Sequence, residues 1–183
     1  MSCSLTAGHS LDCKDTIGGI HEVFFVAFDT LENGITVTSN EVSDLPDMTL
    51  YRYELPKNTG SFTENITSSV ENGTVYWEQV LEFTVFELTT AMRVELESLA
   101  RGRWMVFVRD RNDNMWLMGR YCSAEVTGGS QATGTAKGDL NGYTVTMTAE
   151  EKEPAIKVAS GLKTTYWFDT VPTGTVTVDP SYT

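Results

Sequence analysis

The chain has 183 residues, a length that fits one domain able to bury roughly 70% of its unfolded surface. Its formal net charge of −12 at pH 7 argues against a surface that binds nucleic-acid phosphates, because such surfaces need lysine and arginine to displace counterions. The first residues lack the basic start and apolar run of a signal peptide, and no apolar run approaches about 18 residues. We therefore expect synthesis in a cytoplasm and no membrane segment.

Two strands are expected near the N-terminus. Residues 21–29 (HEVFFVAFD) form an apolar, aromatic run, and residues 34–39 (GITVTS) follow the turn sequence LENG. The polar, proline-marked stretch 40–48 separates this strand pair from a further strand in TLYRYEL.

Residues 60–88 (GSFTENITSSVENGTVYWEQVLEFTVFEL) carry the clearest hairpin signal. Asn72-Gly73 is typical of a two-residue type I′ turn, in which both central residues need positive φ. The resulting register pairs Val70 with Val75, Thr67 with Glu78, Thr63 with Glu82, and Phe62 with Phe83. One face then collects Phe62, Ile66, Val70, Val75, Trp77, Leu81 and Phe83, and the other Ser61, Thr63, Asn65, Thr67, Ser69, Glu78, Glu82 and Thr84.

One helix is predicted after this hairpin. The segment TTAMRVELESLARG offers Thr89 or Thr90 as N-cap and Gly102 as the residue that follows the helix. Apolar residues at helical spacing form its core-facing stripe: Met92, Leu96 and Leu99. The next segment, 103–121, predicts a second, buried hairpin that turns at residues 111–114.

The C-terminal third combines a flexible run, a strand and a tail. Residues 127–142 (TGGSQATGTAKGDLNG) are rich in glycine and predict a flexible connection. In the following strand Tyr143, Val145 and Met147 alternate with threonines at 144, 146 and 148. The tail has strand-like pieces at 164–168 and 175–178, interrupted by prolines.

Catalytic and metal-binding signals are weak. Cys3, Cys13 and Cys122 are an odd number of cysteines in a reducing compartment, which predicts free thiols. With His9 and His21 they supply zinc ligand types, but no CxxC pair is present, so we expect no metal and no cofactor. Neither histidine belongs to a recognisable triad, and we expect that the protein is not an enzyme.

The order of these elements carries a family resemblance. An N-terminal strand pair, a long threonine-rich hairpin, one helix and a buried hairpin precede the stretch TGTAKGDLNGYTVTMTAEEKEPA. Together with the segment LDCKDTIGGI near the start, this order resembles the tail tube proteins of tailed bacteriophages, particularly small ones that begin with a cysteine-containing segment. The resemblance covers residues 3–155.

The resemblance implies a mainly β, α+β fold: a β-sandwich or barrel-like pair of antiparallel sheets with one flanking helix, formed by residues 1–155. Residues 156–183 would be an arm that packs on the domain or on a neighbouring subunit. Six copies would close a ring, and stacked rings would form the tube through which double-stranded DNA leaves the virion without specific binding. Tape measure, baseplate and terminator proteins would be its other partners, and the virion tail its location.

The resemblance also assigns roles to the long hairpin. If its strands line the channel, the lumen-facing residues are Thr63, Thr67, Glu78, Glu82 and Thr84, and the turn at Asn72 and Gly73 contacts another subunit. Carboxylates in the lumen would repel phosphates and let DNA slide. Alternatively, these glutamates only solvate an outer surface.

Two other functions stay open at this point. A collar, terminator or baseplate ring often has the same fold. A carbohydrate-binding β-sandwich would need a platform of exposed aromatic residues, for which Trp116, Tyr166 and Trp167 are the candidates.

Overall fold

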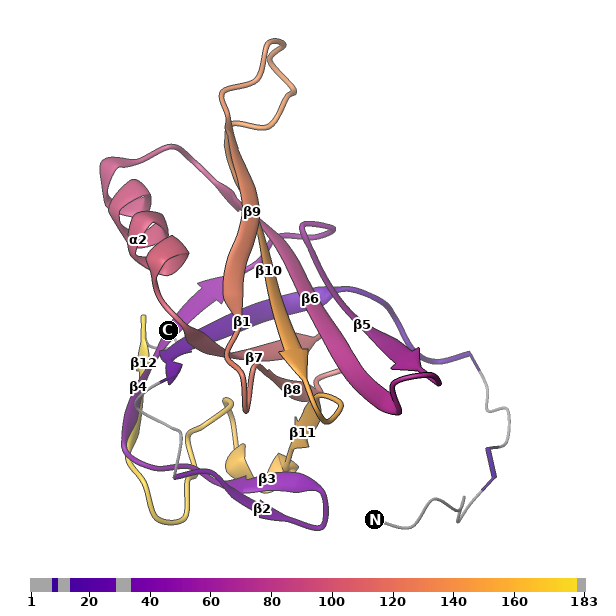
Figure 1. Ribbon diagram of the computed structural model, residues 1–183. Coiled ribbons are helices and arrows are strands. Elements are labelled where there is room, and N and C mark those ends of the chain that lie inside the picture. Colours follow the sequence, from indigo (N-terminus) through magenta and orange to yellow (C-terminus); the bar gives the residue numbers. More distant parts are fainter. Residues whose placement is uncertain (1–7, 10–13, 29–33, 181–183) are drawn as a thin grey trace.

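The protein folds into two β-sheets with one α-helix beside them, as seen in a computed structural model that describes residues 8–9, 14–28 and 34–180 (Figure 1). The predicted α+β, sandwich-like class is thereby confirmed. The eight-stranded sheet has the order β12 (Val176–Asp179), β4 (Met48–Glu54), β1 (Ile20–Ala27), β7 (Trp104–Asp110), β8 (Met115–Met118), β11 (Ile156–Val158), β3 (Glu41–Asp44) and β2 (Thr36–Thr38). The four-stranded sheet has the order β5 (Gly60–Ser69), β6 (Thr74–Phe86), β10 (Gly142–Glu151) and β9 (Glu125–Ala132).

Strand β1 lies between β4 and β7 and is apolar on both faces. Val23 and Phe25 point towards the four-stranded sheet, whereas Phe24 and Val26 belong to the core on the other side. The expected pairing of this strand with residues 34–39 is wrong. Strand β2 pairs instead with β3, which lies in the polar stretch 40–48 that the sequence predicts to be a connection. Only Val42 of β3 is fully buried, so this strand carries almost no period-two hydrophobic signal.

The core between the two sheets is rich in aromatic residues. Phe25 lies 5.1 Å from Tyr53 and 5.7 Å from Phe83, measured between ring centroids. Buried side chains from β6, β7 and β10 complete this core: Leu81, Val106, Val108, Val145 and Met147. The edge-to-face contact of Tyr53 with Phe83, at 6.4 Å between ring centroids, and apolar burial together hold the sheets against each other.

Helix α2 (Thr90–Arg101) confirms the helix prediction, with Thr89 as its N-cap. The Thr89 hydroxyl accepts a hydrogen bond from the backbone N–H of Met92 at 3.1 Å. Leu99 is buried against the inter-sheet core. Gly102 ends the helix with φ of −91°, so it is not in a left-handed conformation. Its role is spatial, since a Cβ there would lie 2.7 Å from Cζ2 of Trp104.

The glycine-rich run after β8 is structured in its first half. Strand β9 extends through Gly128 and Gly129 and pairs with β10, so the expectation of a wholly flexible connection from residue 127 is wrong. A Cβ on Gly129 would lie 2.9 Å from the carbonyl oxygen of Thr144, which explains a glycine inside a strand. The remaining residues, 133–141, form the loop between β9 and β10, called here the β9–β10 loop.

Residues 156–180 cover the second face of the eight-stranded sheet and add β11 and β12 to it. Between them lies the short 3-10 helix η1 (Ser160–Leu162). The strand expected at 164–168 is wrong, because these residues form no regular strand. Trp167 and Phe168 are buried in this second core. The Asp169 carboxylate accepts hydrogen bonds from the backbone N–H groups of residues 164–166 and folds that segment into a loop.

Buried charge fastens this C-terminal segment to the sheet. The Arg109 guanidinium donates to the Glu22 carboxylate at 2.6 Å, and Glu22 is 1% exposed. Arg109 also donates to Asp113, which accepts hydrogen bonds from Lys163 and from the Trp167 indole. Burial alone would lower the pKa of Arg109, but the hydrogen bond and charge of Glu22 and the Asp113 charge raise the pKa above its usual value.

Candidate functional site

The face of the four-stranded sheet that points away from the eight-stranded sheet is a polar surface built by adjoining strands, and we call it the outer face. The neighbouring positions Leu81, Phe83 and Met147 point inward and are buried, which fixes the orientation of the alternating side chains. The register then places the following residues on the outer face: Ser61, Thr63, Asn65, Thr67, Ser69, Thr74, Tyr76, Glu78, Val80, Glu82, Thr84, Phe86, Gly142, Thr144, Thr146, Thr148, Glu150, Glu125, Gly128, Ser130 and Ala132.

All five residues predicted to face the lumen lie on this outer face: Thr63, Thr67, Glu78, Glu82 and Thr84. Three of them are exposed, and Glu78 and Thr84 are half-buried. The sequence of the hairpin alone does not indicate that β10 and β9 continue the same face. The threonine alternation in residues 144–148 was the signal that pointed to it.

The register predicted for the long hairpin is wrong by two residues. Glu78 lies opposite Asn65, not Thr67, and four residues, 70–73, connect the strands in what we call the β5–β6 turn. Of the Asn72-Gly73 pair only Gly73 has a positive φ, 63°, so the turn is not type I′. The Ser69 hydroxyl accepts hydrogen bonds from the backbone and side-chain N–H groups of Asn72 and closes this wider loop. A shift of two leaves each side chain on its predicted face.

The two-residue turn with positive φ occurs elsewhere in the chain. Ser39 and Asn40 have φ of 55° and 64°, and they connect β2 to β3 with Thr38 opposite Glu41. Asparagine tolerates the left-handed region, but serine gives no such signal, so the sequence did not indicate this turn.

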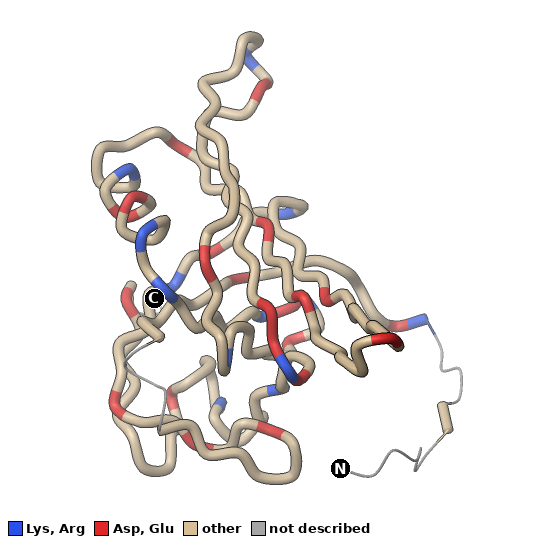
Figure 2. The backbone as a smooth tube through the Cα atoms, in the orientation of Figure 1, with Lys and Arg blue, Asp and Glu red and all other residues tan. Residues whose placement is uncertain are grey.

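The outer face is acidic and carries no lysine or arginine. Its charged residues are Glu78, Glu82, Glu125 and Glu150. Glu78 and Glu150 lie directly opposite each other on β6 and β10, an arrangement of like charges that costs stability. Asn65 donates a hydrogen bond to Glu78 at 3.5 Å, which is long for this geometry. Figure 2 shows acidic positions on the strands of this sheet.

Most other side chains of the outer face are short. One row across the sheet reads Ser61, Glu82, Thr146 and Gly128, and the next reads Thr84, Thr144 and Ser130. β-branched threonine suits a strand, and its hydroxyl remains available to water. Apart from the exposed rings of Tyr76 and Phe86, the outer face is therefore a low, hydrated, negatively charged surface.

Two long strands, β5 and β9, form the edges of this sheet within the described part of the chain. They span ten and eight residues. Their outward N–H and C=O groups form a template for pairing with another chain. Because each neighbouring pair in the sheet is antiparallel, β5 of a second copy placed beside β9 would also run antiparallel and keep the same face outward.

The far half of the β5–β6 hairpin extends past the inter-sheet core. Ile66 and Val75 point to the core side but are 68% and 48% exposed, and Val70 in the turn is 95% exposed. Glu64 anchors the hairpin just before this extension, because its carboxylate accepts hydrogen bonds from Gln79 at 3.0 Å and from the backbone N–H of Ala155 at 2.7 Å. Beyond the anchor, no part of the chain that the structure describes covers the apolar side chains of the hairpin.

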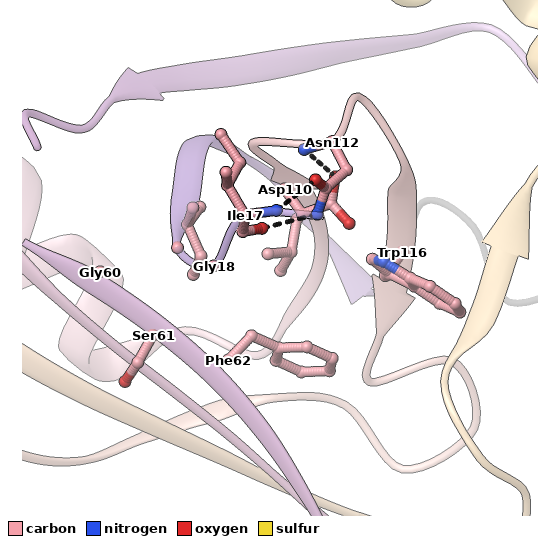
Figure 3. A pocket seen from close by; sticks show the side chains of 11 residues that line it. Ile17, Gly18, Gly60, Ser61, Phe62, Asp110, Asn112 and Trp116 are labelled. Carbon is pink, nitrogen blue, oxygen red and sulfur yellow. Dashed lines mark hydrogen bonds between the residues drawn. The ribbon is translucent and has the colours of Figure 1, made fainter. Parts of the chain in front are cut away.

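A pocket of about 410 Å³ lies where the N-terminal segment meets β5 and the β7–β8 turn (Figure 3). The Asn112 side-chain amide pairs with the backbone of Ile17, accepting from its N–H at 2.9 Å and donating to its C=O at 2.7 Å. Asp110 is the one carboxylate in the lining, and it accepts hydrogen bonds from the backbone N–H groups of Asn112 and Asn114. The Asp110 carboxylate is thus engaged in hydrogen bonds within the turn. The pocket lining contains no second carboxylate that could face it.

The aromatic platform expected for a carbohydrate-binding module is not formed. Trp167 is 2% exposed, and its indole N–H donates to Asp113 at 3.1 Å. Trp116 is half-buried on β8, and Tyr166 is 41% exposed in the C-terminal loop. Burial of Trp167 therefore removes one of the three required stacking surfaces.

Of the three cysteines, only Cys122 falls within the described residues, and it is an exposed free thiol. Partial burial and the nearby Glu151 charge raise the pKa of this thiol. Cys3 and Cys13 lie outside the described residues. Among the residues that the structure describes, no group of three or more histidine, cysteine or acidic side chains could hold a metal ion.

Comparisons with protein-family models, with curated proteins and with solved structures found no match to this chain. No helix in the described ranges has the length and apolar character needed to cross a membrane.

Proposed function

We propose that the protein is the major tail tube subunit of a tailed bacteriophage and that its outer face lines the channel for DNA. The observation that carries this proposal is the outer face itself: four strands with four glutamates, many short hydroxyl side chains and no cation. A phosphate backbone is repelled by such a surface and finds no binding minimum on it.

The sheet edges supply the means of ring closure. Pairing β5 of one copy with β9 of the next extends the sheet with uniform antiparallel polarity and removes both exposed edges once the ring closes. Six copies, as the family resemblance implies, would give a continuous barrel with the outer faces turned inward to the lumen. The role is structural and requires no catalysis. Tape measure, baseplate and terminator proteins would be partners in the virion tail.

The experiment is native mass measurement of the purified protein together with negative-stain microscopy across a range of concentrations. A tube subunit should give hexameric rings that stack without other proteins. A collar, terminator or baseplate protein should stop at single rings. A protein that stays monomeric at every concentration, including after addition of tail fractions, would refute the proposal.

A further inference from the structure

The four-stranded sheet has two protruding ends that differ in charge. Gly142 lies opposite Phe86 at one end of the β6–β10 pair, and Glu151 lies opposite Trp77 at the other end. The β9–β10 loop therefore extends from the first end and the β5–β6 turn from the second, as Figure 1 shows.

The β9–β10 loop presents a cation. The Asp139 carboxylate accepts hydrogen bonds from the backbone N–H groups of Thr135 at 2.9 Å and Ala136 at 2.7 Å. These bonds lower the pKa of Asp139 and hold its exposed carboxylate against the backbone of the loop itself. Lys137 is exposed between the bonded residues and is the one cation of residues 133–141.

The β5–β6 turn presents an anion and an uncovered apolar side chain. Glu71 is exposed, and Val70 beside it is 95% exposed. No lysine or arginine occurs in residues 58–92, so the hairpin supplies no neutralising charge of its own. Hydrogen bonds to the Ser69 hydroxyl shape the turn before any partner arrives.

We propose that these two ends meet between consecutive rings, with the β5–β6 turn of one copy seated on the β9–β10 loop of a second copy and Glu71 paired with Lys137. This inference rests on the proposed tube function and names the axial contact. Strands of a closed barrel tilt by roughly 35–45° from its axis, so the two ends of the sheet reach opposite rims of the ring. Contact between unlike surfaces that does not close on itself builds a filament.

The test is a charge-swap series: Glu71→Lys, Lys137→Glu and the double variant. Each single change places like charges at the contact, and sixfold repetition multiplies a weak surface pair, so we expect the protein concentration for half-maximal tube formation to rise roughly tenfold or more. The double variant restores opposite charges and should return this concentration to within about threefold of the parent. The effect of the single changes should shrink at high salt.

Two controls make the same charge changes elsewhere on the surface. Glu95→Lys and Arg93→Glu alter exposed residues of α2, outside both ends, and should leave tube formation near that of the parent. Native mass measurement of the rings distinguishes failure of the axial contact from failure of the tube function. The axial contact alone would be overturned if every variant forms rings and the single changes still stack normally. It would also be overturned if every variant forms rings but the double variant stacks no better than the single changes. A parent protein that forms no rings would overturn the tube function.

Discussion

Exchange of Glu78 for lysine should stabilise the subunit while it impairs DNA passage. Glu78 lies directly opposite Glu150 on the neighbouring strand, with Asn65 on its other side. Glu78→Lys converts a like-charge pair into an opposite-charge pair. Cross-strand pairs of this kind contribute about 0.2–1 kcal/mol each, so the free energy of unfolding should rise by about that amount.

The assay for the first part is urea unfolding of the subunit under conditions that prevent assembly. Glu78→Gln provides the matched control, because it removes the repulsion without creating an attraction and should give a smaller gain. The gain of the lysine variant should fall with salt, since exposed charges are screened. A lysine variant that is less stable than the glutamine variant at low salt would refute the assumed proximity of residues 78 and 150.

The second part concerns function. Under the proposed ring, Glu78→Lys places a cation in the lumen of each subunit, and phosphates passing through would be retained by it. Particles built with this variant should release their genome more slowly at low ionic strength and recover at high ionic strength. Glu95→Lys makes an equal charge change on α2 and should not slow release. Equal release rates for the two lysine variants at low salt would remove Glu78 from the lumen.

Three further predictions concern the stability of the fold. Gly73→Ala places a Cβ on a residue with a positive φ of 63°, with open space around it. The free energy of unfolding in urea should therefore fall only by the backbone strain of about 1–2 kcal/mol, and a neutral result would mean that the turn relaxes. Trp167→Ala should cost about 3–5 kcal/mol because the indole is buried, whereas Tyr166→Ala nearby should cost far less; similar losses would contradict the burial difference. The Thr164 hydroxyl and neighbouring backbone N–H groups lower the pKa of Asp169. The ionised carboxylate therefore stabilises the fold at pH values above the pKa of an unfolded aspartate, about 3.9, and this stabilisation is lost as the pH falls below it. Proteolysis of the 164–169 loop should increase below that pH, and Asp169→Asn should be cut readily at neutral pH too; an equally resistant variant would exclude this role.

Local patterns predicted the elements better than their pairing. The sequence predicts the strand at residues 142–148 and the helix cap at Thr89 correctly, because each pattern involves residues close together in the sequence. The hairpin register failed because Asn72-Gly73 matches a two-residue turn, while the Ser69 hydroxyl stabilises a wider one. The same error concealed the anchor of the site, since Glu64 lies opposite Gln79 only in the observed register. Pairing between strands distant in sequence leaves no local signal at all.

The placement of β12 has a consequence for how the subunit is made. This strand pairs in parallel with β4, and β11 pairs in parallel with β3, so strands from the last part of the chain complete a sheet begun by the first. Contacts between distant residues slow folding because the loop-closure entropy is lost before the contacts form. A ribosome-bound chain that has not yet released residues 176–179 exposes the edge of β4 and part of the core under Leu50. Pairing of the eight-stranded sheet is therefore completed only after residues 176–179 have left the ribosome.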